Sequence, residues 1–234
     1  MSTHHTSRDF EAELRELRAH AVAMGARCER SLSLAVEAFL TGDAALLSEV
    51  RALDAQINGD EMDIDALVLR VMALRQPVAY DLRLLTSALK LVTDLERIGD
   101  EALNIAERAG DAQQGVEPAE SERLRSMANV AQSMVREALE AFVHDDRAKA
   151  ENVLRSDDAV DALYGEVITL MIAAMEKDPT LVRSGLGVVR VAKYIERIAD
   201  HATNIAEEAL FVMMGDDVRH GNLPRRSVPP AAQS

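Results

Sequence analysis

Two acidic pairs with the same spacing recur in this chain of 234 residues. Glu96 and Asp100 are four residues apart, and Glu196 and Asp200 repeat that spacing. On an α-helix this spacing puts both carboxylates on one face, with Cβ atoms about 5–6 Å apart. Because like charges at that distance repel, clustered carboxylates beside a low-dielectric core either take up protons or bind a cation. The pairs are therefore candidates for cation binding.

Both pairs belong to a sequence repeat with an offset of 100 residues. Between residues 94–107 and 194–207, nine of fourteen positions are identical, including a Glu, an Asp, an Asn and a second Glu. A repeat of this length indicates a duplicated structural unit. We therefore expect the two halves of the chain to share a fold and a chemistry.

Apolar residues recur every three to four positions along most of the chain, which predicts long amphipathic helices. Turn signals separate them at Thr41-Gly42-Asp43, Gln76-Pro77 and Asp178-Pro179, and the last pair is typical of an N-cap followed by proline at the first helical position. The six predicted helices cover residues 10–40, 44–74, 78–110, 119–142, 147–176 and 179–214.

The helix order indicates an all-α fold with two similar halves. A polar N-terminus and a Pro-rich C-terminal stretch lack a periodic apolar face, so we expect both to be flexible. The predicted segments are a flexible N-terminus at 1–9, three-helix bundle repeats at 10–112 and 117–216, and a disordered tail at 222–234.

The second and third helices of each half should form a hairpin, in which residues equally far from the turn face each other. Counting back from the first turn, near Pro77, over the distance that separates it from Glu96 reaches Asp54 and Asn58. The same count around the second turn reaches Asp157 and Asp161. Each hairpin should thus present four oxygen-bearing side chains at one height: Asp54, Asn58, Glu96 and Asp100 in the first, and Asp157, Asp161, Glu196 and Asp200 in the second.

Sites built only from oxygen ligands favour hard cations, so Mg²⁺, Ca²⁺, Mn²⁺ or iron are the expected metals. Zinc prefers Cys or His, and neither belongs to the repeated motif. His201 follows Asp200 and is a weaker candidate ligand, because its counterpart in the first repeat is Glu101. The same motif also fits a solvated helix face on which Glu and Arg form ion pairs worth a few tenths of a kcal/mol. We favour cation binding because the arrangement occurs twice.

The composition narrows the possible classes of protein. Apolar residues make up 48% of the chain and aromatic residues 3%, which is typical of a helix bundle. A net charge of -14 argues against nucleic acid as a direct partner. The single cysteine, Cys28, has core spacing and fits a reducing cytoplasm. No apolar run reaches the length of a transmembrane helix, so membrane contact would go through a partner.

In the two acidic motifs around Glu96 and Glu196, the sequence resembles the PhoU family of phosphate-transport regulators. The resemblance runs from Phe10 to about Gly221 and includes both acidic motifs and the Arg75-Gln76-Pro77 junction. It implies two three-helix bundles related by a pseudo-twofold axis, with a Glu/Asp-x-x-x-Asp pair from each of two helices binding metal. Those positions are the eight residues already named. Asn58 departs from the pattern, since an Asp is expected there, and the first site should therefore bind metal more weakly.

The resemblance also implies the function. PhoU-like proteins are cytoplasmic negative regulators of phosphate uptake and of phosphate-responsive signalling. They are thought to bridge the ATPase subunit of a phosphate ABC transporter to a sensor histidine kinase, and we also expect a homodimer. No phosphate-binding loop, nucleophile elbow or Cys/His nucleophile arrangement is present in the sequence, so an adaptor is predicted and not an enzyme.

Two alternatives stay open. A ferritin-like di-iron enzyme also puts carboxylates inside a helix bundle, but it needs Glu-x-x-His motifs, and no His in this chain has a Glu three residues before it. A metal-free helical scaffold would leave the acidic pairs as solvated faces. Metal analysis of protein purified without chelator distinguishes these possibilities.

Overall fold

The structure, a computed structural model, describes residues 3–109 and 118–215. Within these ranges it contains six α-helices and one short 3₁₀ turn, and it confirms the all-α prediction. The helices are α1 Thr3–Thr41, α2 Ala44–Arg75, α3 Ala79–Ala106, α4 Pro118–His144, α5 Arg147–Lys177 and α6 Val182–Met214, with the 3₁₀ turn η1 at Pro179–Leu181.

Short polar residues start α2 and α5, the first helix of each hairpin. Asp43 caps α2 by accepting a hydrogen bond from the Ala45 amide at 2.8 Å, and Asp146 caps α5 through the Lys149 amide at 3.2 Å. At its other end α2 stops at Gln76, which adopts the left-handed conformation with φ of 49°. These caps fix where each hairpin begins and turns.

Some helix ends differ from the sequence prediction. α1 begins at Thr3, earlier than the predicted start at residue 10. Residues 3–9 continue the helix although the sequence has no apolar periodicity there. Asp178 caps the 3₁₀ turn through the Thr180 amide at 2.9 Å, so α6 starts at Val182. The predicted disordered tail at 222–234 lies outside the described residues.

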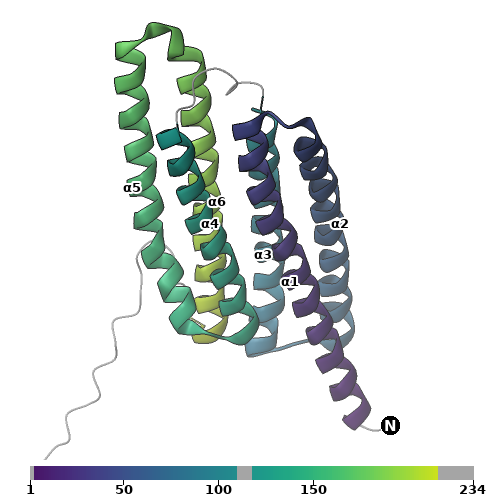
Figure 1. Ribbon diagram of the computed structural model, residues 1–234. Helices are drawn as coiled ribbons and strands as arrows, with labels where there is room; N and C mark the ends of the chain where they lie inside the picture. Colours follow the sequence, from purple (N-terminus) through teal and green to yellow (C-terminus); the bar gives the residue numbers. More distant parts are fainter. Residues whose placement is uncertain (1–2, 110–117, 216–234) are drawn as a thin grey trace, which may run out of the picture.

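Each half forms a three-helix bundle, α1–α3 in the first and α4–α6 in the second, and the bundles lie side by side (Figure 1). α3 and α6 meet in the middle and run in opposite directions, so the α2–α3 turn and the α5–α6 turn lie at opposite ends of the molecule (Figure 1). This is the pseudo-twofold arrangement that the resemblance implied. One apolar core runs through both halves.

Close contact at Gly99 sets the register of the first hairpin. A Cβ atom there would lie 3.0 Å from Cδ1 of Ile57, so glycine lets α2 and α3 approach. In the second repeat Ala199 replaces Gly99 and is larger by one methyl group, whereas Val160 replaces Ile57 and is smaller by one methylene group. The opposed residues therefore keep the same summed volume, and both hairpins hold their acidic residues at the same relative level.

Candidate metal centre

The first candidate site lies on the face of the α2–α3 hairpin, where the counting argument predicted it. Burial and the neighbouring Asp100 carboxylate raise the pKa of Asp54 above its ordinary value. Burial, then Asp100 and the more distant Asp54, also raise the pKa of Glu96. These mutual effects mean that carboxylates from the two helices repel one another across the hairpin.

The individual contacts of this site are few and long. Oδ1 of Asp54 is buried and has no hydrogen-bond partner among the described residues, whereas Oδ2 accepts a 3.5 Å hydrogen bond from the Asn58 amide. Arg97 lies 3.5 Å from both Glu96 and Asp100, and its side chain is 55% exposed. The negative charge of the first site is therefore only loosely balanced by the protein itself.

The second candidate site lies on the equivalent face of the α5–α6 hairpin. Burial and Asp161 raise the pKa of Asp157, and burial and Glu196 raise that of Asp200. Lys193 distinguishes this site, because its Nζ lies 2.7 Å from Oε1 and 2.6 Å from Oε2 of Glu196. The hydrogen bond to Glu196 raises the pKa of Lys193.

The oxygen donor atoms of both sites suit a hard cation. Oδ1 of Asp54, which has no hydrogen-bond partner among the described residues, could accept a cation. The side chains do not converge on one point, however. Within residues 3–109 and 118–215, no three His, Cys, Asp or Glu side chains are close enough together to hold a metal ion. A cation would therefore have to draw the carboxylates inward from their present rotamers, and its positive charge would have to offset their mutual repulsion.

Sequence reasoning missed one acidic residue at the first site. Glu61 is half-buried, and burial together with Asp65 and Asp100 raises its pKa. Glu61 in turn contributes to the raised pKa of Glu96. The signal was present in the sequence, because Glu61 follows Asn58 by three residues and therefore shares its helix face.

The candidate ligand His201 has a different partner. Its Nδ1 lies 2.9 Å from Oδ1 of Asp94 on α3, so the ring joins the two repeats. Its counterpart, Glu101, is 3% exposed and also bridges the repeats through Arg197, whose Nη1 lies 2.7 Å away. Both residues therefore serve the packing of α3 against α6. Cys28 is fully buried and donates to the Leu95 carbonyl at 3.2 Å, as expected of a core residue.

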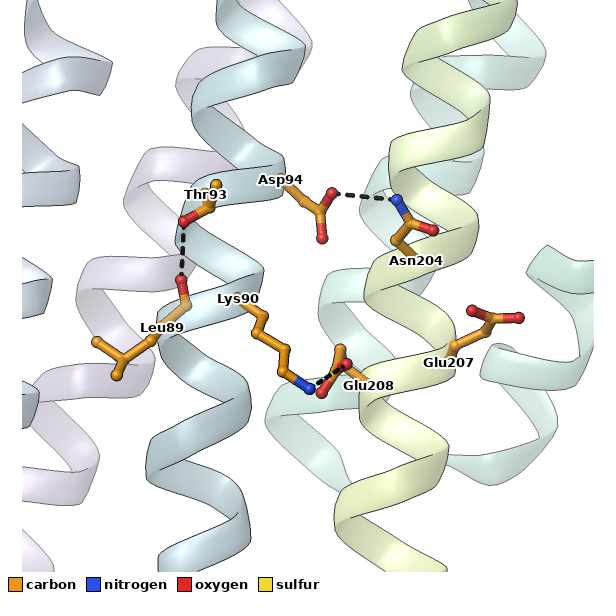
Figure 2. Close-up of a pocket in the computed structure, with 7 residues that line it drawn as sticks. All are labelled: Leu89, Lys90, Thr93, Asp94, Asn204, Glu207 and Glu208. Carbon is orange, nitrogen blue, oxygen red and sulfur yellow. Dashed lines mark hydrogen bonds and ion pairs between the residues drawn. The ribbon is translucent and has the colours of Figure 1, made fainter. Parts of the chain in front are cut away.

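An open cavity of 540 Å³ lies between α3 and α6. Figure 2 shows two pairs of polar side chains that point toward each other across the two helices: Lys90 pairs with Glu208 at 2.8 Å, and Asn204 donates to Asp94 at 3.2 Å. Glu208 also accepts a 2.8 Å hydrogen bond from the buried hydroxyl of Ser87. The cavity wall is thus a network that holds the repeats together.

Comparisons with known proteins place this chain in a family. A family model described as the PhoU domain matches residues 22–109 and again residues 124–209. The phosphate-specific transport system accessory protein PhoU homolog of Pseudomonas aeruginosa is 41% identical over 224 residues, covering 95% of this chain and 93% of that protein. The homolog of Deinococcus radiodurans is 36% identical over 212 residues, covering 88% and 97%.

Solved structures agree with this assignment. The crystal structure of PhoU from Pseudomonas aeruginosa matches with a TM-score of 0.83 at 39% identity, over 88% of this chain and all of that one. The phosphate transport system regulatory protein PhoU from Streptococcus pneumoniae matches with a TM-score of 0.81 at 27% identity, over 89% and 99%. No helix in the described part of the chain is both long and apolar enough to cross a bilayer. With one domain match on each three-helix repeat, the chain belongs to the PhoU family.

Proposed function

We propose that this protein is a negative regulator of phosphate uptake and of phosphate-responsive signalling. The observation that carries the proposal is the similarity, over nearly the full length, to proteins named as accessory proteins of a phosphate-specific transport system. A regulator of a transporter needs to contact it, so we propose the ATPase subunit of a phosphate ABC transporter as one partner and a sensor histidine kinase as the other. Both contacts would be made in the cytoplasm.

The proposed adaptor binds metal at its two acidic faces. Raised pKa values at Asp54, Glu96, Asp157 and Asp200 support this, because crowded carboxylates gain stability when a cation neutralises them. Oxygen donors favour Mg²⁺, Ca²⁺, Mn²⁺ or iron. When bound, the cation would supply positive charge that stiffens each hairpin and changes the surface offered to a partner.

A deletion strain tests the regulatory role. We expect phosphate uptake and alkaline phosphatase activity, used as a reporter of the phosphate response, to stay high when phosphate is plentiful. Expression of the intact chain should restore repression. Normal repression in the deletion strain would contradict the proposal.

The partners are tested by capturing the protein from membranes prepared at high and at low phosphate. We expect the transporter ATPase and the kinase among the captured proteins, with amounts that depend on phosphate. A matched variant, Glu96→Gln combined with Glu196→Gln, should capture less if metal shapes the contact surface. The expected homodimer stays a prediction, which light scattering of the purified protein checks.

Metal analysis after purification without chelator separates the remaining possibilities. A bound hard cation without oxidase activity supports the adaptor. A redox-active pair of iron atoms would favour the ferritin-like enzyme. A metal-free protein that also fails to bind added metal would favour the helical scaffold.

A further inference from the structure

We propose that the end of the α5–α6 hairpin is a docking surface for a protein partner whose contacting segment is acidic and partly apolar. The inference rests on the proposed role as an adaptor and deepens it, because it assigns one contact to particular residues. The hairpin-end surface consists of two arginines and three apolar side chains: Arg183, Arg190, Ile172, Val182 and Leu186.

Large apolar side chains are exposed at this end of the hairpin. Ile172 on α5 is 49% exposed, and Val182 and Leu186 on α6 are 43% and 47% exposed. Met175 of α5 packs against Gly185, where an added Cβ atom would lie 3.0 Å from the Met175 Sδ. Ile172 is one helical turn before Met175 and therefore lies near the level of Leu186. Apolar side chains grouped on a surface typically mark sites of protein contact.

The same end is locally basic, although the chain as a whole has a net charge of -14. Residues 179–195 include no Asp or Glu, whereas they include Arg183, Arg190 and Lys193. Lys193 pairs with Glu196. Arg183 and Arg190 are exposed, and neither makes a hydrogen bond or ion pair with a residue that the structure describes. Two guanidinium groups are therefore free to meet an external carboxylate.

Arg183 differs from its counterpart in the first repeat, Arg83, because α6 is longer than α3. Arg83 donates from Nε and Nη2 to the carbonyl of Val212, at 3.2 and 3.1 Å. Val212 lies in the part of α6 that continues past the counterpart of Ala106, where α3 ends. Arg183 has no equivalent contact among the described residues, and its side chain is exposed.

Arg190 differs from its counterpart, Lys90, in the residue that it would face. Lys90 on α3 pairs with Glu208 on α6 at 2.8 Å. The counterpart of Glu208 in the first repeat is Arg108, so the duplication provides no carboxylate for Arg190 at that position. The first repeat thus uses both of its basic residues to hold α6, whereas the second repeat leaves both exposed.

The position of the surface suits contact with another protein. Figure 1 shows the α5–α6 turn at one end of the molecule, beyond the ends of the neighbouring helices. Val182, Leu186 and Arg190 follow one another at a spacing of four, so the row changes from apolar to basic with distance from the turn. Guanidinium groups bind carboxylates through paired hydrogen bonds. A matching segment therefore places apolar side chains against Leu186 and carboxylates against the two arginines.

An anionic bilayer fits this surface less well than a protein segment does. Attachment to anionic lipid typically requires a cluster of about four to eight Lys or Arg residues. The hairpin end has two unpaired arginines, and the net charge of -14 opposes approach to a negative membrane. A protein needs fewer basic contacts, because its carboxylates are positioned to meet each guanidinium group.

The test measures binding of the intact chain to two purified probes, the ATPase subunit of the phosphate transporter and the cytoplasmic part of the sensor kinase, by isothermal titration calorimetry. Arg183→Glu combined with Arg190→Glu should weaken binding of one probe at least about tenfold and change binding of the other less than about threefold. Retained binding of the second probe shows that the variant is folded. Equal weakening of both probes would contradict a contact at one end.

The matched control combines Arg15→Glu with Arg155→Glu. Both residues are exposed, and neither has a hydrogen bond or ion pair to a described residue. The control changes the net charge by the same amount, so it separates a local contact from long-range repulsion. We expect it to change the affinity for either probe less than about threefold.

The apolar half of the surface is tested by Leu186→Ser. It should weaken binding of the same probe at least about tenfold, because the partner then loses its apolar contact at the centre of the row. Leu69→Ser is the control, since Leu69 on α2 is 61% exposed and lies on the other hairpin. An equal effect of the two substitutions would contradict the proposed surface.

The remaining outcomes separate this inference from the proposed function. If both probes bind and the double arginine variant binds them unchanged, the inference is wrong and the adaptor role stands. If neither probe binds the intact chain, the proposed partners are wrong and the inference fails with them. Sedimentation with phosphatidylglycerol vesicles tests the other occupant. Vesicle binding that the double variant loses, while both probes still bind, would assign the surface to the bilayer and overturn the proposal.

Discussion

Carboxylates on the α3–α6 face and carboxylates on the outer hairpin faces have opposite environments. Glu101 and Glu208, between the repeats, are 3% and 6% exposed, and each has a close cationic partner at 2.7–2.8 Å. Glu96 and Asp54, on an outer face, are less deeply buried, yet they face other carboxylates and have raised pKa values. Carboxylates therefore have different roles at the α3–α6 contact and on the face of the α2–α3 hairpin.

The role of a carboxylate in this fold therefore depends more on its partners than on its depth of burial. A buried carboxylate with a cation and a hydroxyl donor holds two helices together. A half-buried carboxylate that lies near other carboxylates lowers the stability of the fold until a proton or a metal ion neutralises it. Removing a carboxylate charge should therefore lower the free energy of unfolding at the α3–α6 contact and raise it on the outer hairpin face.

The largest effect is expected at Glu208. Glu208→Ala removes the partner of Lys90 and leaves the buried hydroxyl of Ser87 without an acceptor, so the free energy of unfolding should fall by about 2–3 kcal/mol. Urea denaturation measures this. The exposed Glu176→Ala serves as control and should stay within about 0.5 kcal/mol. A loss at Glu208 no larger than that of the control would contradict the claim that this buried, paired carboxylate stabilises the α3–α6 contact.

A smaller loss is expected at Glu101. Glu101→Gln keeps the shape of the side chain but weakens its 2.7 Å ion pair with Arg197, which is itself 47% exposed. We expect about 1–2 kcal/mol of destabilisation in the same assay. Arg97→Ala is a suitable control because Arg97 makes only long contacts on the outer face, and it should cost less.

On the outer face the sign should reverse. Glu96→Gln removes a charge that Asp100 repels, so in metal-free protein at pH 7 the free energy of unfolding should rise by about 0.5 kcal/mol. Glu196→Gln is the matched change in the second repeat and should bring no gain, because it breaks the contact with Lys193. Equal effects of the two substitutions would mean that Lys193 does not distinguish the sites.

The smallest effect is a pH dependence of the Glu96→Gln gain. The pKa of Glu96 is raised above 4.5 in the folded protein, so its protonated form favours folding. That contribution is fully present below the unfolded pKa and is lost as the pH rises through the folded pKa. The advantage of Glu96→Gln should therefore shrink by a few tenths of a kcal/mol between pH 7 and pH 4.5. A constant difference across this range would contradict the prediction.

Much of the candidate site was accessible from sequence because helices convert spacing into position. Four-residue spacing placed Glu96 beside Asp100, and counting from the turn at Pro77 located Asp54 on the facing helix. Glu61 was not predicted, because a four-residue spacing from Asp54 leads to Asn58 and not to Glu61. The contact of His201 with Asp94 could not be predicted from the sequence, because it depends on how the second bundle packs against the first.

The six helices, the duplication and the approximate level of the acidic residues along each hairpin follow from the amino-acid pattern alone. Helical periodicity, capping residues and turn positions are local, and local interactions suffice to set them. Which carboxylates are paired and which are crowded depends on how the helices pack against one another. Contact between α3 and α6 joins residues that are roughly a hundred positions apart in the sequence. It brings Lys90 to Glu208 and Arg197 to Glu101, whereas Glu96 stays near other carboxylates that raise its pKa.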